Sequence, residues 1–250
     1  MKRDGDGPPD PARREVVFLI GSFAAAGLLG CGDGDSSPVA ASSPSSNASS
    51  SGSSCFVRPQ LTEGPYFVDE GLNRSDIRND PTTGAPSAGV PLTLAFRVSR
   101  SSSGACTPLS NAQVDVWHCD ALGTYSDVSD PGFNTAGRRF LRGYQLTDGA
   151  GLAQFTTIYP GWYSGRAVHI HFKIRSAADA TSALEFTSQL FFDESLTDQV
   201  HAQAPYSSKG RRNTTNATDG IYRSGGSQLL LAVVPAGSGY GTTFDIALEI

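Results

Sequence analysis

The chain has 250 residues, of which 17% are charged and 38% hydrophobic, and its formal net charge at pH 7 is −5. This mildly acidic balance lacks the basic excess that nucleic-acid binding needs, so we expect no nucleic-acid partner. The length is sufficient for one domain with a hydrophobic core, accompanied by segments of another kind.

Residues 1–31 have the features of a signal peptide. A polar start with a pair of arginines precedes an apolar run of about 14 residues, shorter than the roughly 20 that a membrane-spanning helix needs. The segment ends in Leu28, Leu29, Gly30 and Cys31, which together resemble the lipobox of bacterial lipoproteins. The sequence therefore predicts export by the Sec or twin-arginine route to the cell envelope or outside the cell. It predicts membrane contact only through a lipid anchor at Cys31.

Residues 32–54 consist almost entirely of small and polar types, above all serine. Such a stretch has little apolar surface to bury, and we interpret it as a flexible linker. Residues 55–250 then form one folded domain.

The cysteines of the domain are Cys55, Cys106 and Cys119. In an oxidising compartment we expect one disulfide and one remaining thiol, and all three pairings stay open. The absence of a CxxC pair from the sequence disfavours a zinc or iron–sulfur site built on cysteine.

Strand patterns dominate the domain, because apolar and polar residues alternate in many short segments. A short helix is expected around 193–203, and the loop 126–139 is too long for a simple hairpin, so we expect it to shape a site. The pattern predicts an all-β fold, an antiparallel β-sandwich with long loops and few short helices. The expected strands are 92–99, 112–117, 152–159, 168–174, 186–192, 229–234 and 244–250.

The strand at 168–174 carries two of the four histidines. With a two-residue period, His169, His171 and Lys173 share one face, while the apolar residues between them share the other. The two imidazoles then stand about 6.6 Å apart at Cα, close enough to converge on one cation. The alternative is an exposed polar strand face.

Two tyrosines make this pair more distinctive. Tyr125 follows a strand that ends near residue 117, and Tyr163 lies in a turn that leads to the histidine strand. A hard trivalent cation favours anionic oxygen and deprotonates a phenol on binding. Two phenols with two imidazoles therefore suit Fe(III) better than zinc.

Six blocks of the domain occur in an order found in a known family: residues 61–67, 112–118, 123–125, 159–163, 169–172 and 188–192. They resemble the intradiol ring-cleavage dioxygenases, which include the protocatechuate and catechol dioxygenases, and span nearly the whole domain from Cys55 onward. The sequence of residues 117–121 is most similar to an exported branch of that family.

The resemblance implies that Tyr125, Tyr163, His169 and His171 ligate a non-haem Fe(III) ion. Tyr125 and His169 would be the equatorial pair, and Tyr163 and His171 the axial pair. It further implies a catechol-type substrate that displaces Tyr163, with O₂ as the second substrate. The product would be a cis,cis-muconate-type diacid.

The resemblance also assigns catalytic roles to Arg166, which would stabilise negative charge near the ring, and to Gln189, which would line the same pocket. The alternatives are a solvated loop arginine and a strand glutamine that points to solvent.

Other candidates are better explained by packing. We expect Tyr159 in the core, His118 in a structural role and Trp117 between the sheets, whereas His201 lies in a polar stretch and is expected to be solvated. For Tyr66, packing and substrate contact are equally open.

Two departures from the family leave substrate and oligomeric state open: a short link between Tyr163 and His169, and no long N-terminal helical segment. The alternative function is an iron- or aromatic-binding β-sandwich module of a surface lipoprotein without turnover. A hydrolase is disfavoured because the sequence has no GxSxG motif.

Overall fold

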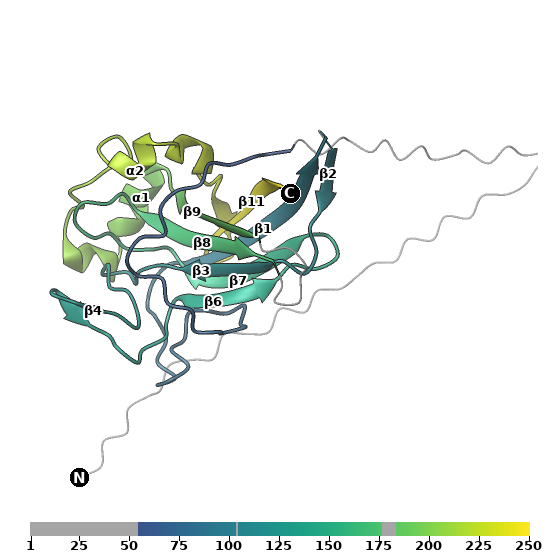
Figure 1. The fold of residues 1–250 in the computed structure, drawn as a ribbon. Coiled ribbons are helices and arrows are strands. Elements are labelled where there is room, and N and C mark those ends of the chain that lie inside the picture. Colours follow the sequence, from purple (N-terminus) through teal and green to yellow (C-terminus); the bar gives the residue numbers. More distant parts are fainter. Residues whose placement is uncertain (1–54, 104, 177–183) are drawn as a thin grey trace, which may run out of the picture. The chain divides into compact units, whose positions relative to one another are not determined.

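The computed structural model describes residues 55–103, 105–176 and 184–250. They form two main β-sheets with short helices at one end, as Figure 1 shows. The predicted all-β sandwich with few short helices is confirmed. The predicted signal peptide (1–31), the lipid anchor at Cys31 and the linker (32–54) lie outside the described residues.

The first sheet has five strands and is built around the long strand β1. β11 pairs with β1 in parallel along one edge, and β7 and β2 pair with it in antiparallel fashion along the other. The β1–β11 ladder is thus a parallel exception to the predicted antiparallel architecture. The strands are β1 Pro91–Ser102, β2 Ala105–Pro108, β7 Leu152–Ile158, β10 Val234–Ala236 and β11 Gly239–Glu249.

The second sheet has four antiparallel strands in the order β6-β3-β8-β9, so the histidine strand β8 is hydrogen-bonded on both sides. Its strands are β6 Arg142–Leu146, β3 Gln113–Trp117, β8 His169–Arg175 and β9 Glu185–Phe191. The remaining elements are the small pair β4 Ser129–Asp130 and β5 Phe133–Asn134, the helices α1 Glu194–His201 and α2 Gly220–Arg223, and the 3₁₀ turns η1 Tyr206–Lys209 and η2 Gly226–Leu229.

Phenylalanines from both sheets form the centre of the core. The ring centroid of Phe96 in β1 lies 5.2 Å from that of Phe172 in β8, and Phe244 of β11 lies 5.7 Å from Phe172. All three side chains are 4% exposed or less. Burying each ring stabilises the fold by about 1.5–3 kcal/mol, and these contacts hold the sheets together.

Strand β8 has the predicted alternation. The apolar residues Ile170, Phe172 and Ile174 are fully buried in the core between the sheets. His169 and His171, on the opposite face, are only 2% and 1% exposed. The alternative of an exposed polar face is therefore wrong, because loops cover this side of the strand as well.

One predicted strand is wrong. The segment 229–234 starts at the end of η2, and only Leu230 forms a bridge, to Phe191, before β10 begins at Val234. Leu229 and Leu231 are nevertheless buried, so the alternation reflects burial of an irregular segment rather than a continuous strand. The predicted helix around 193–203 is confirmed by α1, whose N-cap is Asp193.

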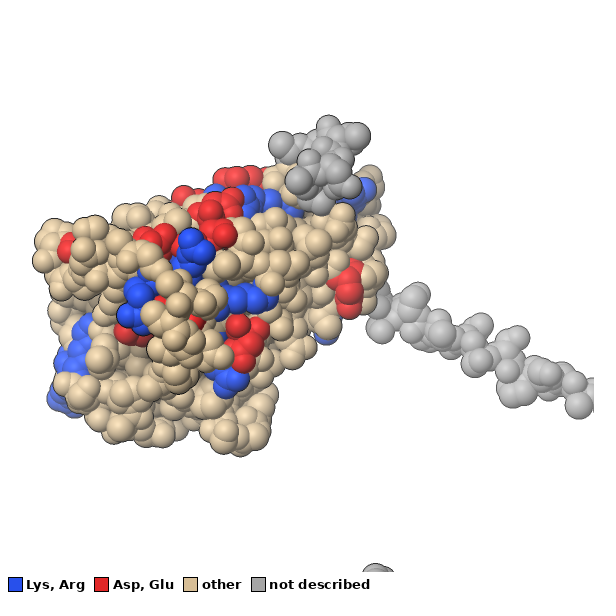
Figure 2. All heavy atoms as spheres, turned by 90° about the horizontal axis from the view of Figure 1, so that it is seen from below, with Lys and Arg blue, Asp and Glu red and all other residues tan. Residues whose placement is uncertain are grey.

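Charged residues of both signs lie side by side on the face that Figure 2 shows. Many of the charged residues pair with each other. Arg175, for example, forms ion pairs with Asp69 at 2.7 Å and with Asp115 at 2.9 Å. In the described ranges, no helix combines the length and the apolar character that crossing a membrane requires.

The structure contains one of the three cysteine pairings that the sequence allows. Cys55 and Cys106 form a disulfide across a sequence separation of 51, and Cys119 is buried as a free thiol. The bridge attaches the start of the described domain to β2.

Replacing Cys55 and Cys106 by serine should lower the free energy of unfolding by about 2–5 kcal/mol, because the bridge restricts a long loop of the unfolded chain. Urea unfolding of the oxidised protein and the double variant measures the difference. Non-reducing peptide mapping is the control, and a bridge that includes Cys119 would contradict this pairing.

Candidate metal centre

Four side chains predicted to be metal ligands meet at one end of the second sheet. The Nε2 atoms of His169 and His171 lie 3.0 Å apart. The Oη atoms of Tyr163 and Tyr125 lie 3.2 and 3.4 Å from the Nε2 atom of His169. The structure thus brings together all four residues, from one strand and two loops.

Two loops that touch through their backbones place the tyrosines. The turn before Tyr125 is organised by Asp120, whose carbonyl oxygen accepts a hydrogen bond from Gly161 N at 3.0 Å. A Cβ atom on Gly161 would lie 2.3 Å from the carbonyl oxygen of Ala121. Only glycine allows this approach, which fixes the loop of Tyr163 against that of Tyr125.

His169 presents a free electron pair to the centre. His169 Nδ1 lies 2.6 Å from the carbonyl oxygen of Ala167; a carbonyl only accepts, so Nδ1 carries the proton and Nε2 does not. Burial, reinforced by the Arg166 charge, lowers the pKa of His169 to about 3. Burial also lowers the pKa of His171 well below its usual range, so both rings are neutral at pH 7.

The phenols are also held in a buried environment. Burial, together with the neighbouring Tyr163, raises the pKa of Tyr125 well above its usual range, and burial likewise raises the pKa of Tyr163. Both phenols therefore keep their protons until a cation is present to stabilise the phenolate form.

The geometry fits one metal ion. Atoms that ligate an ion at about 2.0–2.2 Å are separated from one another by roughly 2.8–3.6 Å. The three separations of 3.0, 3.2 and 3.4 Å fall within that interval. The described residues contain no group of three or more His, Cys, Asp or Glu side chains able to hold a metal ion, so the phenols are needed to complete the set.

Aromatic rings surround the four donors. Trp117 stacks on His171 with centroids 5.0 Å apart and planes within 9°, and Tyr66 stacks on Tyr125 at 4.5 Å. Trp117 therefore does not pack between the sheets as expected. It shares a face of β3 with Asp115 and is paired in register with His171, so it forms a wall of the centre.

Arg166 and Gln189 lie next to the four predicted ligands and bind each other. Arg166 Nη2 donates to Gln189 Oε1 at 2.5 Å, and Gln189 Nε2 donates to the carbonyl oxygen of Thr62 at 2.7 Å. Gln189 is fully buried and the Arg166 side chain is 16% exposed, so the solvated alternatives for both residues are wrong. A second side-chain partner of Arg166, Asp219, was not found from the sequence.

The segment around Gly64 covers the His171 side of the centre. Lys173 Nζ binds Glu63 at 2.5 Å, which ties the segment to β8. Gly64 has a φ of +72°, and a Cβ there would lie 3.2 Å from His171 Cε1. Beyond Gly64, Tyr66 donates its hydroxyl proton to Asp130 at 2.8 Å, so the loop 126–139 does help to enclose the site.

Packing explains most of the other candidates. His118 and Tyr159 are buried and hydrogen-bonded to Thr157 and Thr197, as expected for structural residues. His201 is not solvated: its Nε2 lies 3.0 Å from the carbonyl oxygen of Pro160, and its ring stacks on Tyr206.

Cys119 is not positioned as a ligand. Its thiol donates to the carbonyl oxygen of Gly161 at 3.5 Å, and burial raises the pKa of the thiol to about 12.

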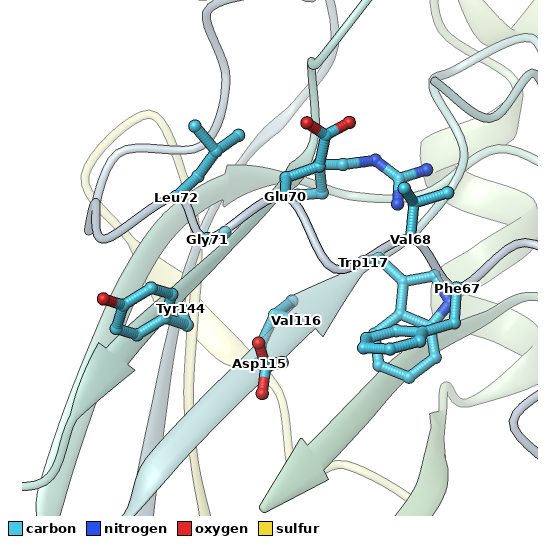
Figure 3. Close-up of a pocket in the computed structure, with 11 residues that line it drawn as sticks. Phe67, Val68, Glu70, Gly71, Leu72, Asp115, Val116, Trp117 and Tyr144 are labelled. Carbon is cyan, nitrogen blue, oxygen red and sulfur yellow. The ribbon is translucent and has the colours of Figure 1, made fainter. Parts of the chain in front are cut away.

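A small cavity lies beside Trp117 and is lined by residues of β3, β6 and the segment 67–72 (Figure 3). Phe67 packs on Trp117 there with centroids 4.8 Å apart, while Asp115 and Tyr144 project from neighbouring strands. Its volume of about 20 Å³ is far below the roughly 300 Å³ or more of ligand pockets, so an aromatic ring does not fit in this cavity.

Comparisons with known proteins show the family of this chain. A family profile described as "Dioxygenase" matches residues 62–210. An intradiol ring-cleavage dioxygenase from Tetranychus urticae is 29% identical with a TM-score of 0.69, over 78% of this chain and 95% of that one. The dioxygenase domain of a carbohydrate-binding fusion protein from Streptomyces sp. SirexAA-E is 28% identical with a TM-score of 0.54, over 78% and 99% of the two chains.

This chain belongs to the dioxygenase family, and within it to the intradiol ring-cleavage group. Among curated proteins it is similar to catechol 1,2-dioxygenase 2 of Acinetobacter lwoffii, with 36% identity over 113 residues. That match covers 42% of this chain and 35% of the relative, so the chain matches about a third of the relative's length.

The position of Gly64 can be tested with a matched pair of variants. Gly64→Ala and Gly84→Ala impose the same backbone strain, because both glycines have a φ of +72°, but only the Cβ at residue 64 meets the site; nothing lies within 4 Å of residue 84. We expect Gly64→Ala to weaken metal binding by at least about tenfold and Gly84→Ala to leave it unchanged. Titration of the metal-free proteins measures both affinities, and equal affinities would contradict the proposed closeness of Gly64 to the metal.

Proposed function

We propose that this chain is a non-haem Fe(III) dioxygenase that cleaves a catechol-type ring between its two hydroxylated carbons. O₂ supplies both inserted oxygen atoms, and the product is a cis,cis-muconate-type diacid. The observation that carries the proposal is the convergence of Tyr125, Tyr163, His169 and His171 on one buried point. Membership of the intradiol group supports it.

Fe(III) suits these donors better than other common metals. Two phenolates supply the anionic oxygen that a hard trivalent ion favours, and two neutral imidazoles complete the set. When bound, the ion would act as a Lewis acid and template for the two oxygens of the substrate.

Tyr163 is the ligand best placed to leave during substrate binding. Its side chain is partly exposed and sits on the short link to β8, whereas Tyr125 is 1% exposed and stacked on Tyr66. Once released, the phenolate oxygen of Tyr163 would take a proton from an incoming catechol hydroxyl. Its raised pKa favours keeping that proton.

Arg166 would stabilise negative charge on the bound ring. Its guanidinium is held in place by Gln189 and Asp219 beside the proposed ligands. Tyr66 and Phe133, with ring centroids 6.3 Å apart, provide an aromatic wall for a flat substrate.

We also propose that the enzyme acts outside the cytoplasm, exported by the signal peptide and anchored through Cys31. The Cys55–Cys106 disulfide is compatible with an oxidising compartment, in which such bonds persist. Diffusible aromatic compounds would then reach the enzyme before uptake.

Tyr125→Phe and His169→Ala should lose the colour that arises from charge transfer between tyrosinate and iron. They should also lose at least about a hundredfold in oxygen uptake with a catechol panel, because each removes a ligand. Tyr240→Phe is the matched control, since Tyr240 lies in β11 of the other sheet. Optical spectra, iron analysis and an oxygen electrode provide the readouts.

Wild-type protein that binds iron but consumes no oxygen with any catechol would support the non-catalytic binding module instead. Full activity in Tyr125→Phe would contradict the ligand assignment.

A further inference from the structure

We propose that Asp219 is the residue that positions Arg166 for catalysis. The segment that carries it would then belong to the active site, although the family match ends at residue 210. This inference rests on the proposed function, because it concerns how the charge beside the reacting ring is held.

Both carboxylate oxygens of Asp219 are fully used. Oδ2 accepts from Arg166 Nε at 2.9 Å and from Ala167 N at 2.7 Å. Oδ1 accepts from the backbone amides of Ile221 and Tyr222 at 2.7 and 3.0 Å and so caps α2. The residue is 1% exposed, and one side chain therefore joins α2 to the segment that precedes the histidine strand.

Arg166 is held from two directions. Asp219 fixes its Nε, and Gln189 accepts from Nη2 at 2.5 Å. Within the described residues Nη1 has no hydrogen-bond acceptor, so it is the donor left for a bound ligand. Hydrogen bonds between charged groups are stronger and more directional than neutral ones, and they restrict the guanidinium to one orientation.

The same carboxylate also acts on the peptide next to His169. Asp219 binds the amide of Ala167, and the carbonyl oxygen of Ala167 accepts from His169 Nδ1 at 2.6 Å. That bond fixes the tautomer and the ring orientation of the ligand. Asp219 thus contacts neither the substrate nor the proposed metal, but it supports one residue on each side of the reaction.

The charge of Asp219 matters for this role. Burial raises the pKa of its carboxyl group, but the hydrogen bonds from Ala167, Tyr222 and Arg166 outweigh burial and keep the pKa below its usual range. The side chain is therefore a carboxylate at neutral pH and balances the partly buried Arg166 cation.

Asp219→Asn tests the role because asparagine can still cap α2 but has no charge. If its oxygen keeps the cap of α2, its amino group takes the place of Oδ2 and faces two other donors, Arg166 Nε and Ala167 N, so the bond to Arg166 is lost. We expect the full-length variant to retain iron and colour and to lose more than tenfold in kcat with catechol. Asp193→Asn is the control, since Asp193 caps α1 in the same way and has no bond to Arg166; its kcat should stay within twofold of wild type.

A double-mutant cycle separates positioning from general structure. In an Arg166→Ala background, Asp219→Asn should change kcat by less than twofold, because its partner is already absent. The thermal midpoints of the iron-free proteins provide a readout independent of turnover. The decreases in thermal midpoint caused by Asp219→Asn and Arg166→Ala should be non-additive in the double variant. The decreases caused by Asp193→Asn and Arg166→Ala should be additive.

A kcat of Asp219→Asn within twofold of wild type would overturn the proposal. So would an effect of the same size in the Arg166→Ala background. If Asp219→Asn does not fold, Asp219→Ser, which also caps helices, takes its place under the same criteria. Failure of the proposed function appears differently, as wild-type protein without turnover while the coupling of midpoints in the iron-free protein persists.

Discussion

Four electron-pair donors facing one another in a buried space are the constraint on which the structure depends. The Nε2 atoms of His169 and His171 are 3.0 Å apart, and the hydroxyls of the buried Tyr125 and the partly exposed Tyr163 stand beside them. Such groups are costly to bury without a partner. The proposed cation at their centre would satisfy all of them together.

The sandwich brings the four donors together because its strands end at the same place. β3 runs towards Trp117, β8 starts at His169 in the opposite direction, and Trp117 pairs with His171. The loop after β3 carries Tyr125, and the loop after β7 carries Tyr163. The helical segment that follows β9 then supplies Asp219, which fixes Arg166 beside the ligands. The site is therefore assembled from almost every part of the described domain.

Local sequence patterns predicted the strands that pack regularly, but they did not predict contacts between residues far apart in the sequence. The alternation in β8 was sufficient to assign both of its faces, and the family blocks predicted the four side chains that the structure brings together. Asp219 lies 53 residues from Arg166, and Thr62 lies 127 residues from Gln189, so no spacing in the sequence links either pair. The irregular segment 229–234 buries Leu229 and Leu231 as a strand would. The two-residue period of its apolar residues could not reveal that it lacks the continuous hydrogen bonds of a β-ladder. Trp117 was misplaced because an aromatic on a strand gives no sign of which layer it joins.

The most direct test of the account is a crystal structure of the protein as isolated, with anomalous diffraction recorded at the iron absorption edge. The account predicts one iron peak about 2.0–2.2 Å from Oη of Tyr125 and Tyr163 and from Nε2 of His169 and His171. An iron peak elsewhere, or the four side chains closed on one another around no metal in active protein, would contradict it.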